Sequence, residues 1–208
     1  AFLYSCLSQE EARKLADKLL IDIFDRNLFF ASGSTSILVH IAFLYPCLLQ
    51  EEVRKLADEL LIDILDKDLF FSSWTKGYNP LFLGITFKNL GEFKKSFDMY
   101  NHAIRYAKES NFNQIEATAL IYLGELYRIQ KNYDIALDHY FQSIEILDKI
   151  GAKCDLAEAY FQLALTYQAM GDQTNSQTYF NKALDLWGPE QINAPKQIER
   201  VKKAMKND

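Results

Sequence analysis

One pattern is written three times in this chain at a spacing of 40 residues, as FLGITFKNLGEFKKSFDMYNHAI (82–104), YLGELYRIQKNYDIALDHYFQSI (122–144) and QLALTYQAMGDQTNSQTYFNKAL (162–184). Each copy places a small residue, an aromatic, a second small residue and a second aromatic at the same positions. They are Gly84, Phe87, Ser96 and Tyr100, then Gly124, Tyr127, Ala136 and Tyr140, then Ala164, Tyr167, Ser176 and Phe180. Small residues let two helices approach closely, and aromatic rings fill the space between neighbouring pairs. The pattern therefore predicts two antiparallel helices per copy.

This pattern resembles the tetratricopeptide repeat, in which L-G-x-x-Y is followed by A-x-x-x-F. The resemblance covers residues 77 to 188 and implies an all-α fold, a right-handed α-α superhelix built as a solenoid of antiparallel helical hairpins. The position usually held by Trp carries Pro80, Leu120 and Tyr160 instead. Because the usual spacing is roughly 34 residues, we expect helices extended by about a turn and a half. Such long repeats are similar to those of spindle-orientation adaptors, kinesin light chains and bacterial signalling regulators.

The chain divides by pattern into three regions, which we expect to form one continuous solenoid. The repeats occupy 77–116, 117–156 and 157–188, a C-terminal capping helix occupies 189–208, and a divergent helical-hairpin region occupies 1–76. In the capping segment Ile198, Val201 and Met205 follow helical spacing, so they are expected to pack on the last repeat.

The first region contains an internal duplication. AFLYSCLSQEEARKLADKLLIDIFDRNLFF (1–30) returns at 42–71 as AFLYPCLLQEEVRKLADELLIDILDKDLFF, with seven differences. A recent duplication, a shared functional surface and an artefact all account for this identity, and a homo-oligomer formed through this region is a further hypothesis. Because the chain begins at Ala1, without Met or a basic leader, we expect a piece of a longer protein.

The composition argues against several classes of function. The chain has 23 Lys and Arg against 28 Asp and Glu, a net charge of −5, so no basic field favours nucleic acid or an anionic membrane. No apolar run approaches the roughly 20 residues that span a bilayer. The three cysteines, Cys6, Cys47 and Cys154, lie far apart, which favours a reducing, cytoplasmic setting over a disulfide framework or a zinc site.

The residue pattern predicts a protein that is not an enzyme and uses no cofactor or metal. Glycine-rich phosphate-binding motifs are missing, and His40, His102 and His139 lie apart. Two carboxylate pairs stand one helical turn apart, Asp22 with Asp25 and Asp63 with Asp66. They suit acid–base chemistry or a divalent cation, or else form a solvated helix face. We favour the solvated face.

The family resemblance implies a concave groove lined by the first helix of each repeat. Its inward positions are Tyr78, Leu81, Ile85, Lys88 and Asn89, then Thr118, Ile121, Glu125, Arg128 and Ile129, then Glu158, Phe161, Leu165, Gln168 and Ala169. A clamp for chaperone tails would need Lys and Asn at the fifth and ninth positions, which are mostly apolar here. The mixed groove instead suits an amphipathic helix or a short apolar peptide.

The leading hypothesis is therefore a scaffold that binds another protein or peptide in its groove. One alternative is a ligand-responsive sensor domain of a larger protein, of the peptide-pheromone-receptor or signalling-ATPase type. Another is that the groove residues pack against other parts of the same protein.

Overall fold

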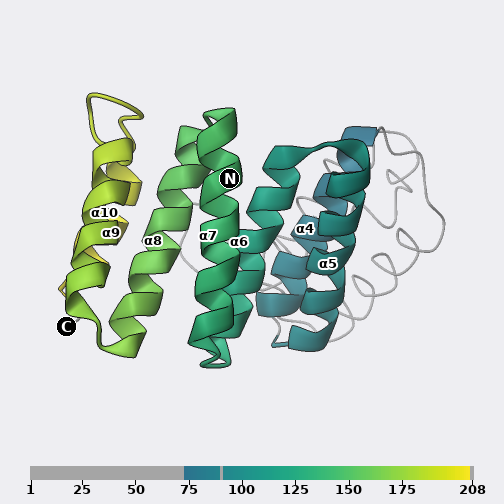
Figure 1. Ribbon diagram of the computed structural model, residues 1–208, viewed down its shortest axis with the longest axis horizontal. Coiled ribbons are helices and arrows are strands. Elements are labelled where there is room, and N and C mark those ends of the chain that lie inside the picture. The colour runs from purple at the N-terminus through teal and green to yellow at the C-terminus, as the bar shows by residue number, and fades with distance from the viewer. Residues whose placement is uncertain (1–72, 90, 207–208) are drawn as a thin grey trace, which may run out of the picture. The chain divides into compact units, whose positions relative to one another are not determined.

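A computed structural model describes residues 73–89 and 91–206 (Figure 1), and this part of the chain is all helix and turn. Its helices are α4 (Ser73–Asn89), α5 (Phe93–Ser110), α6 (Asn113–Ile129), α7 (Tyr133–Ile150), α8 (Lys153–Met170), α9 (Gln173–Trp187) and α10 (Pro195–Ala204). The predicted all-α, tetratricopeptide-like solenoid of helical hairpins is confirmed. The duplicated region, its acidic pairs, Cys6, Cys47 and His40 lie outside the described residues.

The chain forms two compact units that meet in sequence between Met99 and Tyr100. In the first unit, the Ser96 hydroxyl of α5 donates a hydrogen bond of 2.7 Å to the carbonyl oxygen of Gly84 on α4. These are the two small residues of the first repeat, so the close approach that they were expected to permit is present. The turn between the two helices contains Gly91 in the left-handed region, at φ 78°.

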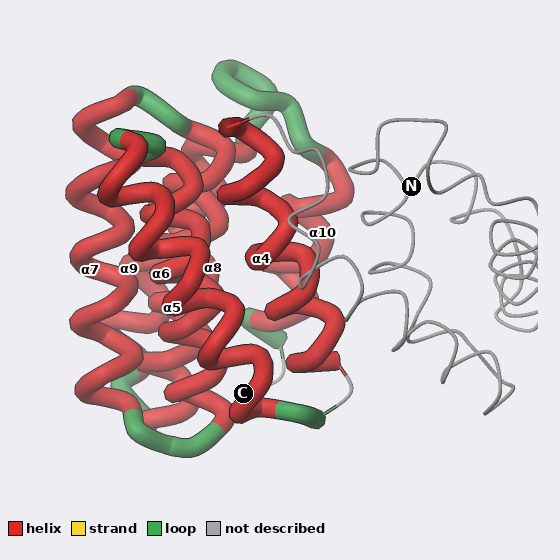
Figure 2. The backbone as a smooth tube through the Cα atoms, turned by 90° about the vertical axis from the view of Figure 1, so that its right-hand side faces the viewer, coloured by secondary structure: helices red, strands yellow, loops and turns green. Residues whose placement is uncertain are grey.

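In the second unit, α6 and α7 pack as one hairpin and α8 and α9 as the next, and α7 also packs on α8. Figure 1 shows α6, α7, α8 and α9 following one another in chain order. Figure 2, turned by 90°, shows α7 and α9 toward one side and α8 and α10 toward the other. The first helix of each hairpin is called an A helix below, and the second a B helix.

The A and B helices of the second unit touch most closely where the motif places glycine. A Cβ atom added at Gly124 would lie 2.6 Å from the Tyr140 ring, and Tyr140 is fully buried. The hairpin turns are equally tight, with Lys131 at φ 62° and Gly171 at φ 81° in equivalent positions of successive repeats. Lys131 therefore adopts a backbone conformation that glycine holds more easily.

Helix length accounts for the long repeat. Both A helices in this unit begin four residues before the expected repeat boundaries, α6 at Asn113 and α8 at Lys153, and they run for 17 and 18 residues. The boundaries at 117 and 157 thus fall inside helices, because the extra residues of the 40-residue repeat lengthen the helices rather than the turns.

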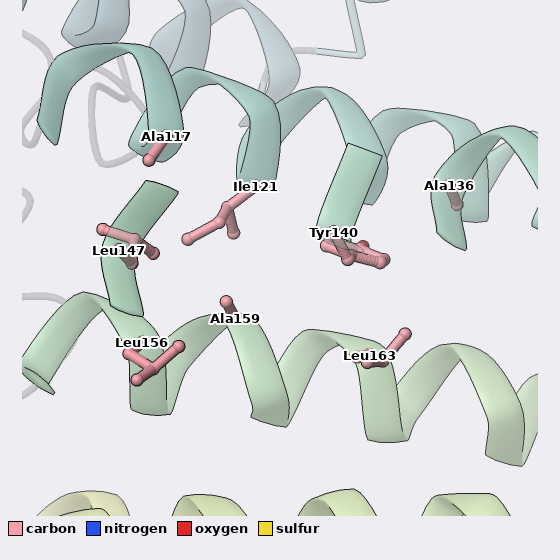
Figure 3. Packing of buried hydrophobic residues seen from close by; sticks show 8 residues of the cluster. All are labelled: Ala117, Ile121, Ala136, Tyr140, Leu147, Leu156, Ala159 and Leu163. Atoms are coloured by element: carbon pink, nitrogen blue, oxygen red, sulfur yellow. The ribbon is translucent and has the colours of Figure 1, made fainter. Parts of the chain in front are cut away.

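Two apolar clusters hold the second unit together. The first joins α6, α7 and α8 (Figure 3) through Ala117, Ile121, Ala136, Tyr140, Leu147, Leu156, Ala159 and Leu163. Alanines at the points of closest approach leave room for the larger side chains between them. Burial of this apolar surface stabilises the stacking of one hairpin on the next.

The second cluster joins α8 and α9 to α10. It consists of Ala157, Phe161, Ala164, Phe180, Ala183, Trp187 and Val201. Val201 follows Phe161 by 40 residues, and Ala204 follows Ala164 by the same interval. The short helix α10 thus continues the repeat register of the A helices. As expected from helical spacing, Ile198 and Met205 pack against this cluster together with Val201.

Candidate functional site: the exposed face of the A helices

The structure divides the expected groove residues between the two units. Tyr78, Leu81, Ile85, Lys88 and Asn89 belong to α4 of the first unit, and the others belong to α6 and α8 of the second. In α4, Tyr78, Ile85 and Lys88 are partly exposed, and Asn89 is exposed. In the second unit, the partly exposed members are Thr118, Glu125, Arg128, Glu158, Leu165 and Gln168, and we call these six residues the A-helix face.

Three expected groove residues lie in the core. Leu81 is 2% exposed, and Ile121 and Phe161 are each 3% exposed. All three occupy the fifth position of the motif. Ile121 is buried in the cluster of Figure 3, and Phe161 lies in the cluster completed by α10. At Ile121 and Phe161, the apolar floor expected from the sequence is therefore filled by neighbouring helices and is not open.

A chain of hydrogen bonds crosses the second unit beside this face. Arg128 on α6 donates to the Gln162 side-chain oxygen at 3.1 Å, and Gln162 donates to a Glu158 carboxylate oxygen at 2.8 Å. Arg200 on α10 then donates to both oxygens of Glu158, at 2.7 Å and 3.0 Å. Glu158 is consequently the shared acceptor that links α8 to α10. The sequence did not indicate Gln162 or Arg200 as members of this network.

Arg200 also lies over the aromatic ring of Phe161, 4.1 Å from the ring centroid. Stacking of a guanidinium on a ring, together with a two-pronged carboxylate bond, is the arrangement in which arginine binds most strongly. Arg200 therefore attaches α10 to α8. Gln168 adds a further bond by donating to the Ala204 carbonyl oxygen at 3.1 Å.

Replacing Arg200 by Ala should release α10 locally. Because the Arg200 and Glu158 side chains are 42% and 29% exposed, solvent weakens their pairing, and we expect only about 1 kcal/mol for the pair and its ring contact. Amide hydrogen exchange within α10 should become about fivefold faster, while exchange in α6 and α7 stays unchanged. Lys202→Ala, at an exposed position of the same helix, is the control. Equal acceleration in both variants would contradict an anchoring role for Arg200.

Carboxylates dominate the electrostatics around Tyr122, which lies in the middle of α6. Burial raises the pKa of Tyr122 to about 12, and the negative charges of Glu158, Glu125 and Asp155 add to this rise, while Arg200 opposes it. Asp155 itself accepts a hydrogen bond of 2.7 Å from the Gln114 side chain. The Tyr122 hydroxyl therefore stays protonated at physiological pH, within a negative local potential.

Arg128 lies in the last turn of α6, where the two polar groups beside its guanidinium are uncharged. Its Nε atom is buried, and no hydrogen-bond acceptor for it lies in the part of the chain that the structure describes. The neighbouring Tyr140 hydroxyl has its pKa raised to about 12 by burial, with the positive charge of Arg128 acting in the opposite direction. Both polar groups beside the guanidinium, the Gln162 amide and the Tyr140 hydroxyl, are thus uncharged.

The remaining chemistry-bearing side chains do not converge on the A-helix face. Among the residues that the structure describes, no three His, Cys, Asp or Glu side chains gather closely enough to hold a metal ion. His139 stacks on Tyr127 with ring centroids 5.3 Å apart, and burial lowers the pKa of His139 despite the nearby Asp138. None of the described helices has the length and hydropathy needed to cross a membrane.

Comparison with known proteins agrees with this geometry. The sequence model of a tetratricopeptide repeat family matches residues 79–149 and 115–188, which together exceed half of the chain. The chain belongs to the tetratricopeptide repeat family, whose members are generally protein–protein interaction modules.

Two particular proteins are similar to it. The 43 kDa receptor-associated protein of the synapse from Gallus gallus is 28% identical over 98 residues, which are 46% of this chain and 24% of that protein. The match thus spans about a quarter of the relative's length. The crystal structure of BtubC (BKLC) from P. vanneervenii superposes with a TM-score of 0.68 at 15% identity, over 96% of this chain and 82% of that one. At this identity the likeness concerns the fold alone.

Proposed function

We propose that this protein is an interaction module that binds an amphipathic helical segment of another protein along its A-helix face. The observation that carries the proposal is the mixture of side chains that α6 and α8 leave partly exposed there. Leu165, which also packs against the cluster completed by α10, is partly exposed on the same helix as Glu158 and Gln168, and Arg128 is partly exposed on α6. A few apolar anchors surrounded by a polar rim are characteristic of surfaces that bind an amphipathic helix.

Further apolar surface adjoins this face at the end of α6. Ile129 follows Arg128 directly and is 43% exposed, and Ala169 next to Gln168 on α8 is also exposed. The bond between Arg128 and Gln162 brings the end of α6 beside the middle of α8, where Leu165 lies one turn after Gln162. Apolar contacts are therefore available on both helices, which suits a ligand with a continuous apolar stripe.

The proposal can be tested with a displayed library of helix-forming peptides of about 18 residues. Each peptide carries leucines at positions i, i+4 and i+7, so that they form one stripe. For peptides selected on the wild-type protein, Leu165→Glu should weaken binding at least about tenfold, because it places a charge against the leucine stripe.

The matched control is Ile135→Glu. Ile135 is an aliphatic residue on the B helix α7 and is 44% exposed. This variant should bind the selected peptides within about twofold of the wild type, and thermal unfolding should show that both variants remain folded. If no selected peptide distinguishes Leu165→Glu from Ile135→Glu, the A-helix face is not the binding surface.

A further inference from the structure

Two arginines extend beside the A-helix face, and their environments differ. Arg200 forms an ion pair with Glu158 through both carboxylate oxygens. Arg128 donates to an uncharged amide oxygen, and its buried Nε has no acceptor among the described residues. No described carboxylate lies within 4.0 Å of the Arg128 guanidinium, whereas the other described ion pairs join Lys95 to Glu92 and Lys108 to Glu116.

The nearby described carboxylates do not form an ion pair with Arg128. Glu158 already accepts bonds from Arg200 and Gln162, so its oxygens are engaged on the side of α10. Glu125 stands one turn before Arg128 on the same helix, and its charge, like that of Arg128, influences the Tyr140 hydroxyl. It does not reach ion-pairing distance of the guanidinium. Within the described part of the chain, Arg128 is consequently a partly desolvated cation that donates to a neutral amide, which is unfavourable without a counter-charge.

The surroundings of Arg128 indicate which kind of partner group would pair with its guanidinium. Arg128 is partly exposed, the next residue on α6 is the exposed Ile129, and Leu165 lies one turn after Gln162, which accepts the Arg128 hydrogen bond. A side-chain carboxylate delivered from an apolar helix stripe would satisfy the planar guanidinium with charge-assisted hydrogen bonds, while its neighbours cover the aliphatic surface. Arginine in such a setting is among the residues that contribute most to the affinity of interfaces.

We infer that Arg128 is the charge anchor of the binding face and pairs with the side-chain carboxylate of a Glu or Asp in the bound amphipathic helix. This inference rests on the proposed function and adds to it the chemistry of the partner. The bound segment carries a carboxylate next to its apolar stripe, at the place that meets the end of α6.

A double-mutant cycle tests the pairing. The probes are selected library peptides with one Glu beside the leucine stripe, amidated at the C-terminus so that side chains supply every carboxylate. Changing this Glu to Gln should weaken binding to the wild-type protein about tenfold and binding to Arg128→Gln by less than about twofold. Arg128→Lys should retain an intermediate preference for Glu, because it keeps the charge without the planar fork.

The outcomes separate this inference from the proposed function. Peptides that lose affinity with Leu165→Glu, yet show the same Glu-to-Gln effect on wild type and Arg128→Gln, would overturn the role of Arg128 and leave the face intact. Selected peptides that ignore both Leu165 and Arg128 would overturn the proposed function as well. Thermal unfolding of Arg128→Gln and Arg128→Lys shows whether the fold is retained, and the comparison within each variant cancels any general loss of affinity.

Discussion

Trp187→Ala should lower the free energy of unfolding by about 3 to 5 kcal/mol, as expected for truncation of a large buried aromatic side chain. Trp187 is 1% exposed at the end of α9, and its ring centroid lies 6.1 Å from the ring centroid of Phe161 on α8. The cluster around it also includes Val201 of α10. Alanine would leave a cavity among three helices that the short helix α10 is poorly able to fill by moving.

Urea unfolding followed by far-ultraviolet circular dichroism measures this loss independently of the tryptophan signal. Trp187→Phe is the control, because it retains a ring and leaves a smaller cavity, so it should cost less than half as much. An equal loss of stability in both variants would show that the size of the cavity does not determine the effect. A loss below about 1 kcal/mol for Trp187→Ala would contradict its place in the core.

Gly124→Leu should be destabilising by about 3 kcal/mol, although leucine favours helix formation over glycine by nearly 1 kcal/mol. The reason is the Tyr140 ring, three atoms of which lie between 2.6 and 3.0 Å from the position of an added Cβ. Tyr140 is fully buried and cannot turn outward without opening the interface between α6 and α7. The sign of the change in the free energy of unfolding therefore shows whether helix propensity or packing has the larger effect at this position.

The double variant Gly124→Leu with Tyr140→Ala provides the control for this contact. Removing the ring should relieve most of the cost of leucine, so the two substitutions should be strongly non-additive in urea unfolding. Ala164, at the equivalent position of the next repeat, already accommodates a methyl group opposite Phe180. Additive effects, or a stabilising Gly124→Leu, would show that the helices separate at this point without penalty.

The pattern of small and aromatic residues predicted the helical hairpins because these residues act on their nearest neighbours. Ser96 against Gly84 and Tyr140 against Gly124 are contacts between helices joined by a short turn. Such contacts recur in every repeat, so each leaves a periodic trace in the sequence. The packing of Val201 was predicted from a different signal, the helical spacing of Ile198, Val201 and Met205.

The candidate site was less predictable from the sequence than the hairpins. The family pattern indicated Leu81, Ile121 and Phe161 as groove residues, but the structure places all three in the core. Conversely, Gln162 and Arg200 carry no signal in the sequence that distinguishes them from other polar residues on amphipathic helices. Their roles depend on partners 34 to 42 positions away in the chain.

The sequence by itself determined that this chain builds an all-α tetratricopeptide array, because side-chain volume at periodic positions decides which helices can pack closely. Only the tertiary structure decided which of those positions remain available to a partner. Exposure depends on what the next hairpin or α10 covers, and the charge of a site depends on which side chains meet across helices. That is why Phe161 is buried beneath Arg200, while Arg128 donates its hydrogen bond to the uncharged amide of Gln162.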